Sequence, residues 1–449
     1  MTSQSLSTPP PSPVEEESDF SARKIRISLV VLLGTMFGST TLPLMAIGLL
    51  LLPMTQEFGW SRTEFSGGQT AMMLAGACAS PLLGRMVDRL GVRRMILLGT
   101  LVVALVVIGM SRLDGQLWQF YAAFALLGVT GTTAIGYSKV IGSLFTRHRG
   151  KALAIFGVES SVAMAFMPPM ILWMITSLGW RGMFVGMGLV ILATVPISYF
   201  FLPEPDAPGA PAESGQPVSS DRLPGLTVPE ILRDRSFWLI AIASLLAIGP
   251  AFGLMPHFLP YLTERGFNAA SLGWVLTAMT IAMAAGTIIG GWATDHAKRA
   301  WIAAPFSLLT TLALVCFMLM SASFGGVPLL IFAMSLLGFA GGAQRPMGTY
   351  FQIRFFGLKS FGALTGIQSP FLALGMGLAP LAVGWCYDHY GSYQPAFLVM
   401  ALCMAITVLL YAVLGPYRYA PNLAAEIPVE EEGAPGEREI SPRPSPSVA

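Results

Sequence analysis

The chain has 449 residues, of which 54% are hydrophobic and only 11% charged, and its formal net charge is +2. Soluble domains carry roughly 25% charged residues, so this composition excludes an ordinary soluble protein and predicts a protein embedded in a lipid bilayer. The small net charge excludes a strongly basic nucleic-acid binder, and we expect no nucleic-acid partner.

In chain order, residues 1–24 are rich in Pro and Ser with an acidic run, and we expect a disordered tail there. Twelve apolar segments follow, each near the length of about 20 residues that crosses the hydrocarbon core. They predict an all-α integral membrane fold with twelve transmembrane helices. The segments are 27–52, 66–86, 94–111, 117–143, 151–176, 182–202, 236–262, 271–293, 300–320, 327–351, 361–386 and 394–415.

A stretch rich in Pro, Gly and Ser separates the first six segments from the last six, and its composition is typical of a linker. The predicted domains after the N-terminal tail are a six-helix bundle, a cytoplasmic linker, a second six-helix bundle and a disordered C-terminal tail. Their ranges are 25–202, 203–235, 236–416 and 417–449.

The two halves repeat in sequence. A shift of 207 residues places "LPMTQEFGW" (52–60) on "LPYLTERGF" (259–267) and Asp88 on Asp295. Because an even number of helices separates the copies, both halves have the same orientation and form parallel six-helix repeats. In transporters built this way, the substrate site lies between the halves near the midplane.

The basic residues predict the orientation. Most of the 26 Lys and Arg residues fall in the tails and loops that share a side with the N-terminus. The excess of positive charge in cytoplasmic loops therefore predicts that both termini are cytoplasmic. The opposite loops hold only Arg62, Arg112, Arg181 and Arg265.

The loop "GRMVDRLGVRR" (84–94) follows the second segment, and "GWATDHAKR" (291–299) is its degenerate copy in the second half. A glycine, an Asp-Arg pair, a second glycine and two arginines at this spacing resemble the signature loop of the major facilitator superfamily. The resemblance covers residues 25–415 and implies transport by alternating access with this loop as a conformational gate. The implied gate residues are Gly84, Asp88, Arg89, Gly91, Arg93, Arg94 and Asp295.

Two further stretches, "EFGWSRTEFS" (57–66) and "RHRGKALAIFGVESSVAMAFMPP" (147–169), resemble the bacterial monocarboxylate transporter and oxalate/formate antiporter group. This resemblance implies a multi-pass protein of the bacterial inner membrane, and we expect it to move a small organic anion, a carboxylate, by proton symport. Anion exchange is an alternative. One feature departs from the group, because the eighth segment, "LGWVLTAMTIAMAAGTIIGGW" (272–292), lacks the usual arginine. The 25 methionines keep a proton-driven exporter of a hydrophobic compound open as an alternative.

Three charged residues lie away from the ends of the predicted segments, where a charge costs at least about 2.5–3.5 kcal/mol unless it is paired or functional. Arg345 is the predicted receptor for a substrate carboxylate, because the repeat equivalent of Glu159 is the neutral Gln368. The alternatives for Arg345 are that it snorkels toward the cytoplasm or pairs with Glu159 across the interface between the halves. Lys139 is expected at the depth of Glu159, where it either pairs, snorkels or contacts substrate. Tyr137 and Tyr261 are further candidates for substrate contact, with ordinary packing as the alternative.

Proton coupling requires a group that changes its protonation during transport. Glu159 is one candidate, and His257, between Pro256 and Pro260, is the second because histidine titrates near neutral pH. An interfacial or core histidine is the alternative for His257. The chain shows no cluster with metal-ligand spacing, no nucleophile elbow and no phosphate loop, so we expect neither an enzyme nor a cofactor.

Overall fold

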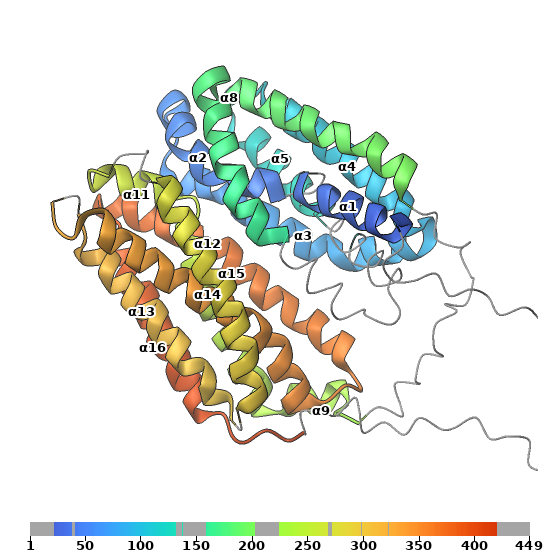
Figure 1. The fold of residues 1–449 in the computed structure, drawn as a ribbon, viewed down its shortest axis with the longest axis vertical. Coiled ribbons are helices and arrows are strands. Elements are labelled where there is room, and N and C mark those ends of the chain that lie inside the picture. Colours follow the sequence, from blue (N-terminus) through green and yellow to red (C-terminus); the bar gives the residue numbers. More distant parts are fainter. Residues whose placement is uncertain are drawn as a thin grey trace, which may run out of the picture.

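The computed structural model describes residues 22–37, 41–131, 137, 159–202, 224–267, 272–297, 299–321 and 323–419. The regular elements within these residues are helices, with three isolated β-bridges beside them (Figure 1). In the first half the helices are α1 (Ala22–Phe37), α2 (Thr41–Phe58), α3 (Arg62–Leu90), α4 (Val92–Met110), α5 (Leu117–Thr130) and α8 (Glu159–Phe201).

In the second half, the short helices α9 (Val228–Arg233), α11 (Phe258–Glu264) and the 3₁₀ helix η3 (Ala300–Ala303) accompany six longer ones. The longer helices are α10 (Arg235–Leu254), α12 (Leu272–His296), α13 (Ala304–Leu319), α14 (Gly326–Phe356), α15 (Phe361–Tyr390) and α16 (Gln394–Val413).

Helix lies within each of the twelve predicted segments. Nine stretches of the described residues are long and apolar enough to cross a membrane. One of them, Phe166–Phe201, contains two predicted segments, because the left-handed backbone at Gly179 (φ 72°) joins two helices within α8. The remaining two segments correspond to α3, whose charged ends lower its mean hydropathy, and to the shorter α5. The all-α membrane fold is confirmed.

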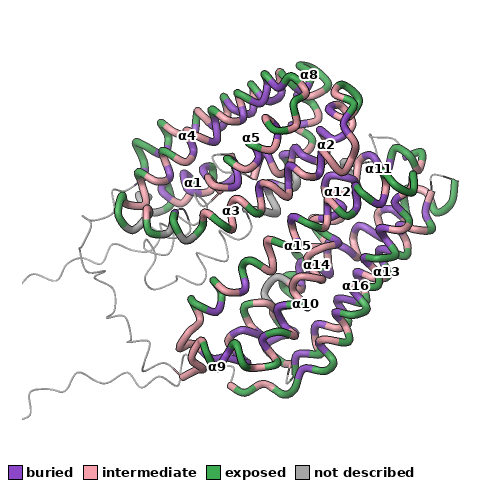
Figure 2. Tube along the Cα trace, turned by 180° about the vertical axis from the view of Figure 1, so that it is seen from behind, coloured by how far each residue is buried: buried purple, intermediate pink, exposed green. Residues whose placement is uncertain are grey.

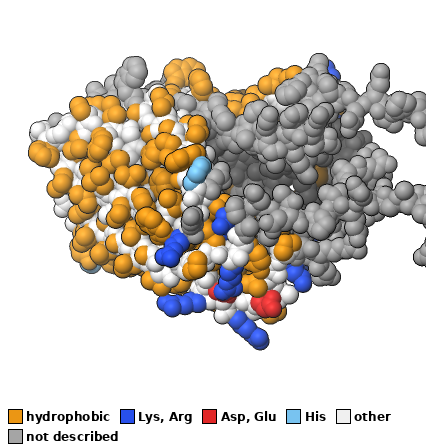
Figure 3. Space-filling view, turned by 60° about the horizontal axis from the view of Figure 1, so that its bottom comes forward, with side chains coloured by type: hydrophobic (Ala, Val, Ile, Leu, Met, Phe, Trp, Pro, Cys, Tyr) orange, Lys and Arg blue, Asp and Glu red, His pale blue; other side chains and the backbone are white. Residues whose placement is uncertain are grey.

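The helices form two bundles (Figure 1). α1–α5 and α8 pack on one another around two apolar clusters, and α10–α16 pack around two others. Large apolar side chains such as Phe200 and Ile288 are exposed on the outside, at 76% and 73%. Hydrophobic side chains cover much of the described surface in Figure 3, and the bundle interiors are buried in Figure 2. Such a surface is adapted to lipid.

One close contact occurs in both halves and confirms the parallel repeat. A Cβ added at Gly128 of α5 would lie 2.0 Å from the carbonyl oxygen of Met72 in α3. In the second half, a Cβ at Gly338 of α14 would lie 2.4 Å from the carbonyl oxygen of Met279 in α12. Met72 and Met279 are related by the 207-residue shift, so glycine allows the same helix pair to touch in each half.

The segment 224–233, which composition places in the linker, packs on the second bundle. The N–H of Leu226 donates to the carbonyl of Phe356 (2.8 Å), and Ile231 is buried in the core of this bundle. Thr227 donates from its backbone N–H and its hydroxyl to Glu230, both at 2.8 Å, which lowers the pKa of this exposed carboxyl. This capping box begins α9, which marks one end of the molecule (Figure 1).

The glycine contacts give a first test. An alanine at Gly286 of α12 would place its Cβ 2.0 Å from the carbonyl oxygen of Phe339 in α14, so the two helices must separate. We expect Gly286→Ala to lower the unfolding temperature of the detergent-solubilised protein, by the equivalent of about 1–3 kcal/mol.

Gly341→Ala is the matched control, because it lies on α14 and an added Cβ there has nothing within 4 Å. Its unfolding temperature should equal or exceed that of wild type. Equal unfolding temperatures for the two variants would contradict the close approach of α12 and α14.

Candidate functional site

The two bundles touch mainly along α3 of the first and α15 of the second, with smaller contacts between α8 and α12 and between α2 and α11. In Figures 1 and 2, these helices converge at the end that carries α11, away from α9. This contact joins two parts of the chain that are otherwise separately packed.

The stretch before α3 places its first turn against the other bundle. α2 ends before Gly59, whose positive φ of 70° suits glycine. The N–H of Ser61 donates to the carboxylate of Glu64 (2.8 Å), and the N–H of Glu64 donates to the hydroxyl oxygen of Ser61 (3.1 Å). This reciprocal capping box fixes the start of α3 at Arg62.

A carboxylate from the second bundle caps α3. Asp388, near the end of α15, accepts from the backbone N–H of Arg62 (3.1 Å) and of Thr63 (2.8 Å), and also from the Thr63 hydroxyl. These N–H groups are among those that a helix leaves unpaired at its start, where the helix dipole also favours negative charge. The cap therefore links the two bundles through charge-assisted hydrogen bonds.

The side chain of Arg62 extends the same contact. Its guanidinium forms an ion pair with Glu264 at the end of α11 (2.6 Å) and donates to the hydroxyl of Tyr393. It also lies 3.5 Å from the ring centroid of Tyr387, a cation–π geometry. The Arg62 side chain is only 14% exposed and that of Glu264 is 35% exposed, so the guanidinium is mostly covered while the ion pair reaches the surface.

His257 lies buried in the middle of this contact. It occupies the turn between α10 and α11, and its exposed fraction is 0%. Its Nε2 lies 3.0 Å from the Ser66 hydroxyl of α3 and 3.0 Å from the Pro380 carbonyl of α15, and its Nδ1 lies 3.3 Å from the Tyr393 hydroxyl. The ring therefore bridges both bundles.

One turn deeper, α3 bonds directly to the backbone of α15. The Gln69 amide donates to the carbonyl of Met376 (3.2 Å), and the Thr70 hydroxyl donates to the carbonyl of Gly377 (2.6 Å). We call the whole contact the end seal. It comprises Arg62, Thr63, Ser66, Gln69, Thr70, His257, Glu264, Met376, Gly377, Pro380, Tyr387, Asp388 and Tyr393.

A cleft of about 330 Å³ follows the end seal along α3 and α15, with α5 as its third wall. Its described lining is apolar and rich in methionine, with one hydroxyl, that of Ser369. Methionine side chains adapt to apolar ligands of varied shape. The lining residues are Met72, Met73, Gly76, Ala77, Gly128, Gly131, Ser369, Leu372, Ala373 and Met376.

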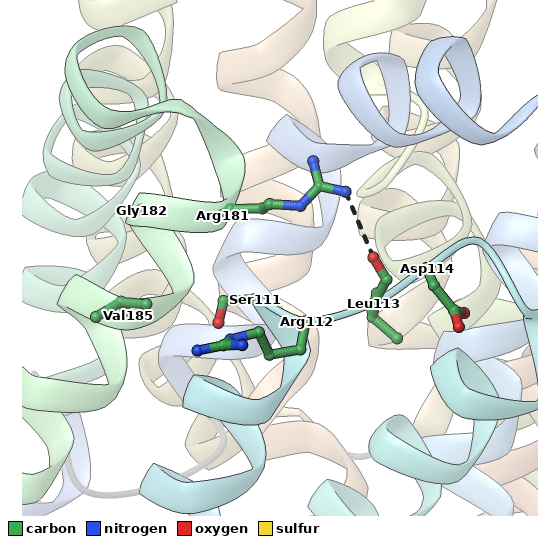
Figure 4. Close-up of a pocket in the computed structure, with 7 residues that line it drawn as sticks. All are labelled: Ser111, Arg112, Leu113, Asp114, Arg181, Gly182 and Val185. Atoms are coloured by element: carbon green, nitrogen blue, oxygen red, sulfur yellow. Dashed lines mark hydrogen bonds between the residues drawn. The ribbon is translucent and has the colours of Figure 1, made fainter.

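A second hollow belongs to the first bundle alone (Figure 4). It lies between the loop 111–114 and the second helix of α8, and Arg181 reaches from it to the carbonyl of Leu113 (3.4 Å). Arg181 also pairs with Glu57 (2.5 Å), which accepts from the indole N–H of Trp180 (2.6 Å). These contacts tie α2 to α8 and hold the first bundle together at the end that carries the seal.

The charged residues predicted inside the membrane lie outside the part of the structure that can be described in atomic detail. Lys139 is outside the described residues altogether. The backbones of Glu159 and Arg345 belong to α8 and α14, but their side chains are not among those described. The roles predicted for these three residues stay predictions.

The two tyrosines predicted to contact substrate lie in the cores of their own bundles. Tyr137 packs against Gly34, and its hydroxyl is 3.5 Å from that of Ser198. The hydroxyl of Tyr261 donates to the carbonyl of Phe317, beneath the end seal. In this conformation both hydroxyls face protein, so contact with substrate stays a prediction for each.

The predicted gating loop contains one left-handed residue, Gly91, with φ 84° between α3 and α4. Arg93 donates to the carbonyl of Tyr199 and lies 5.1 Å from its ring centroid, which ties α4 to the end of α8. Arg89 and Arg94 are exposed. The other predicted gate residues are Gly84, Asp88 and Asp295. The surroundings of Gly84 and the side chains of Asp88 and Asp295 are outside the described part of the structure.

Of the end seal, sequence reasoning singled out only His257 as a functional candidate. One signal was present, because the repeat alignment that pairs "LPMTQEFGW" with "LPYLTERGF" places Glu57 on Glu264. Each glutamate ends a helix at the same end of its bundle and binds an arginine, Arg181 for Glu57 and Arg62 for Glu264.

Comparison with known proteins relates the chain to one family. The model of the Major Facilitator Superfamily matches residues 27–270 and 251–444. Mouse Monocarboxylate transporter 11 is 23% identical over 79% of this chain and 80% of its own length. The D-galactonate transporter of Escherichia coli O6:H1 is 23% identical over 62% of this chain and 69% of its own length.

Solved structures show the same fold. A bacterial homologue of the human lysosomal transporter Spinster, in an inward-facing and unoccupied conformation, aligns with a TM-score of 0.68. The alignment covers 87% of this chain and 96% of that one, at 14% identity. The occupied form of the inward-facing Spinster homologue aligns with a TM-score of 0.64 over 92% of this chain and 98% of that one.

The cap on α3 can be tested by removing its charge. Asp388→Ala leaves the first N–H groups of α3 without their acceptor, and a hydrogen bond to a charged group contributes about 1.5–3 kcal/mol. We expect the bundles to separate at this end in a larger fraction of molecules, by about tenfold. Spin labels on Asp114→Cys and Ser323→Cys, one on each bundle at this end, would report a longer distance.

The control is Asp234→Ala, which removes a carboxylate that caps α10 within the second bundle by accepting from the N–H of Ser236 (2.8 Å). It should leave the distance across the seal unchanged. If Asp388→Ala also left it unchanged, the cap would not hold the bundles together.

Proposed function

The chain belongs to the major facilitator superfamily, and we propose that it is a secondary active transporter that moves a small organic anion, a carboxylate, by alternating access. It is a multi-pass membrane protein, and it is a transporter rather than an enzyme. The observation that carries the proposal is the end seal, which joins two separately packed bundles through side chains at one end. Two rigid bundles with a separable contact are what alternating access requires.

The distribution of basic residues supports an orientation in the bacterial inner membrane. With both termini cytoplasmic, as the loops predict, the end seal lies on the outer side and α9 on the cytoplasmic side. The structure then represents an inward-facing conformation, in which the outer end is closed. The cleft beside the seal would be reached from the cytoplasm.

Two observations support an organic anion as the substrate. They are the anions in the names of the relatives and a neutral hydrogen-bond network in the second bundle. Gln368, the repeat equivalent of Glu159, is buried and donates to the Ser244 hydroxyl (3.1 Å). It accepts from the amide of Gln352, which in turn accepts from Thr365 (3.1 Å). These amides and hydroxyls satisfy one another without a carboxylate, so this network offers no negative charge to the predicted carboxylate receptor Arg345.

The remaining predicted roles belong to the same proposal. Lys139, Tyr137 and Tyr261 would assist Arg345 in the conformations that contain substrate. Glu159 and His257 would exchange the proton of a symport cycle. An anion exchanger would need no such proton, so a dependence of uptake on the proton gradient separates symport from exchange.

The methionine-rich cleft favours a second candidate, export of a hydrophobic compound. Met72, Met73 and Met376 line a space whose described walls carry few polar groups. The same cleft would also accept the apolar body of a larger carboxylate, so the charge of the transported compound decides between the two functions.

Uptake by proteoliposomes tests the anion proposal. With an inward proton gradient and a panel of radiolabelled carboxylates, wild type should accumulate at least one of them. Arg345→Gln should reduce this uptake at least tenfold, because it removes a charge-assisted contact of about 1.5–3 kcal/mol.

Arg112→Gln, in an exposed loop on the first bundle, is the control and should transport as wild type does. Full uptake by Arg345→Gln would show that Arg345 does not bind the substrate. If no carboxylate is taken up and efflux of apolar cations or neutral compounds is found instead, the second candidate replaces the first.

A further inference from the structure

We propose that the end seal closes only around a neutral His257, so that a proton bound by His257 opens the outer end of the transporter. This inference rests on the proposed alternating-access function and adds the device that couples the proton to the gate. It follows from an account of which atoms in the seal can donate a hydrogen bond and which can only accept one.

The two neighbours of Nε2 determine whether it carries a hydrogen. The Pro380 carbonyl oxygen, 3.0 Å from Nε2, can only accept, so Nε2 carries a hydrogen. The Ser66 hydroxyl donates to the carbonyl of Arg62 (2.8 Å), so its oxygen is left to accept from His257 as well. Both neighbours of Nε2 therefore require the Nε2–H form of the ring.

Nδ1 lies against a hydroxyl that is already engaged by Arg62. The guanidinium of Arg62 has only donors, so the oxygen of Tyr393 accepts from it. In the neutral ring, the hydroxyl hydrogen of Tyr393 is donated to Nδ1, 3.3 Å away. The neutral tautomer, with hydrogen on Nε2 and a lone pair on Nδ1, therefore gives each of these partners a hydrogen bond without placing a second cation beside the Arg62 guanidinium.

Together these hydrogen bonds form a closed cycle in which each residue donates to the next. The Arg62 side chain donates to Tyr393, Tyr393 donates to His257, and His257 donates to Ser66. Ser66 completes the cycle by donating to the backbone carbonyl of Arg62. Both bundles contribute to this cycle of hydrogen bonds, so it exists only while the end seal is closed.

A proton on Nδ1 breaks this arrangement. Nδ1–H would then point at the Tyr393 oxygen that already accepts from Arg62, and the Tyr393 hydroxyl would lose its acceptor. Two cations, the imidazolium and the guanidinium, would meet at one phenol oxygen. Because His257 has no exposed surface, water cannot supply the missing partners.

The charged groups that act on the imidazole of His257 are Arg62 from α3 and Asp388 from α15. Asp388 would attract an imidazolium, but its carboxylate already accepts three hydrogen bonds at the start of α3. Glu264 of α11 is engaged by Arg62 (2.6 Å). Neither carboxylate is therefore placed to accept from Nδ1, and the protonated ring is relieved only when the bundles separate and water reaches it.

Protons from the outer side would favour the open state of the outer gate. Acid on the outer side protonates His257 whenever the seal opens. Before the seal can form again, this proton returns to the outer solution or passes to Glu159, the second predicted proton-coupling residue, and only the second route carries it through a symport cycle. His257 then serves as a proton-binding residue of the transport cycle whose occupancy depends on the conformation of the seal.

The test measures the distance between spin labels on Asp114→Cys and Ser323→Cys from pH 8.5 to pH 5.0, without substrate. The background replaces the native cysteines by alanine, at Cys78, Cys316, Cys386 and Cys403. We expect the fraction of wild-type molecules with the longer, open distance to rise at least tenfold as the pH falls. His257→Gln should stay closed at every pH, because its amide donates and accepts as the neutral ring does but does not titrate.

Tyr393→Phe is the second variant, and it keeps the proposal testable if His257→Gln fails to fold. It removes the donor to Nδ1 and the acceptor of Arg62, so the seal should already be open in more molecules at pH 8.5 and should respond less to pH. An opening that persists in His257→Gln, or a wild-type seal that stays closed at pH 5.0, would overturn the proposal. Because no substrate is needed, a failed uptake assay with an intact pH response would overturn only the proposed substrate.

Discussion

The contact between the bundles depends on the cap that Asp388 places on the first turn of α3. Inside lipid, a helix satisfies its own backbone, and only its ends keep free N–H groups. The start of α3 is such an end, and it receives a carboxylate from a helix of the other bundle. The interaction is strong because it is charge-assisted, and it is confined to one turn, so a small rotation of one bundle can release it.

Contacts within and between the bundles share close glycine packing but differ in their polar bonds. Inside the second bundle, Gly286 brings two helices into backbone contact that a single added carbon would disrupt. Between the bundles, a Cβ added at Gly48 would likewise lie 2.5 Å from the carbonyl oxygen of Met255. Side chains such as Gln69 and Thr70 also bond to carbonyls of α15, where water can replace those bonds when the bundles part. Such replaceable bonds favour a contact that opens and closes.

Sequence patterns predicted the fold because they are local or repeated. The apolar segment 271–293 corresponds to α12, and the glycine at 91 adopts the left-handed backbone expected of a tight turn. The seal could not be predicted in this way, since Arg62 and Asp388 are 326 residues apart. Charge counting treated Arg62 as one of four cations in outer loops, because a count records a charge and not its partner.

The repeat shows why the site needed the structure. Glu57 and Glu264 are equivalent in the two halves, yet Glu57 binds Arg181 within its own bundle and Glu264 binds Arg62 across the seal. The repeat therefore aligns the two acids but does not indicate their partners, since the gate arises where the two halves differ.

For His257, the sequence left two alternatives open, a core residue and a coupling residue. The structure shows a residue that is fully buried and yet held by both bundles. These descriptions are compatible in a transporter, because the same ring is part of a core while the seal is closed and would meet water once it opens. A titratable group couples protons to a conformational change only when its surroundings differ between the two states. A histidine placed between two separable bundles satisfies that condition, whereas one placed inside a single rigid bundle does not.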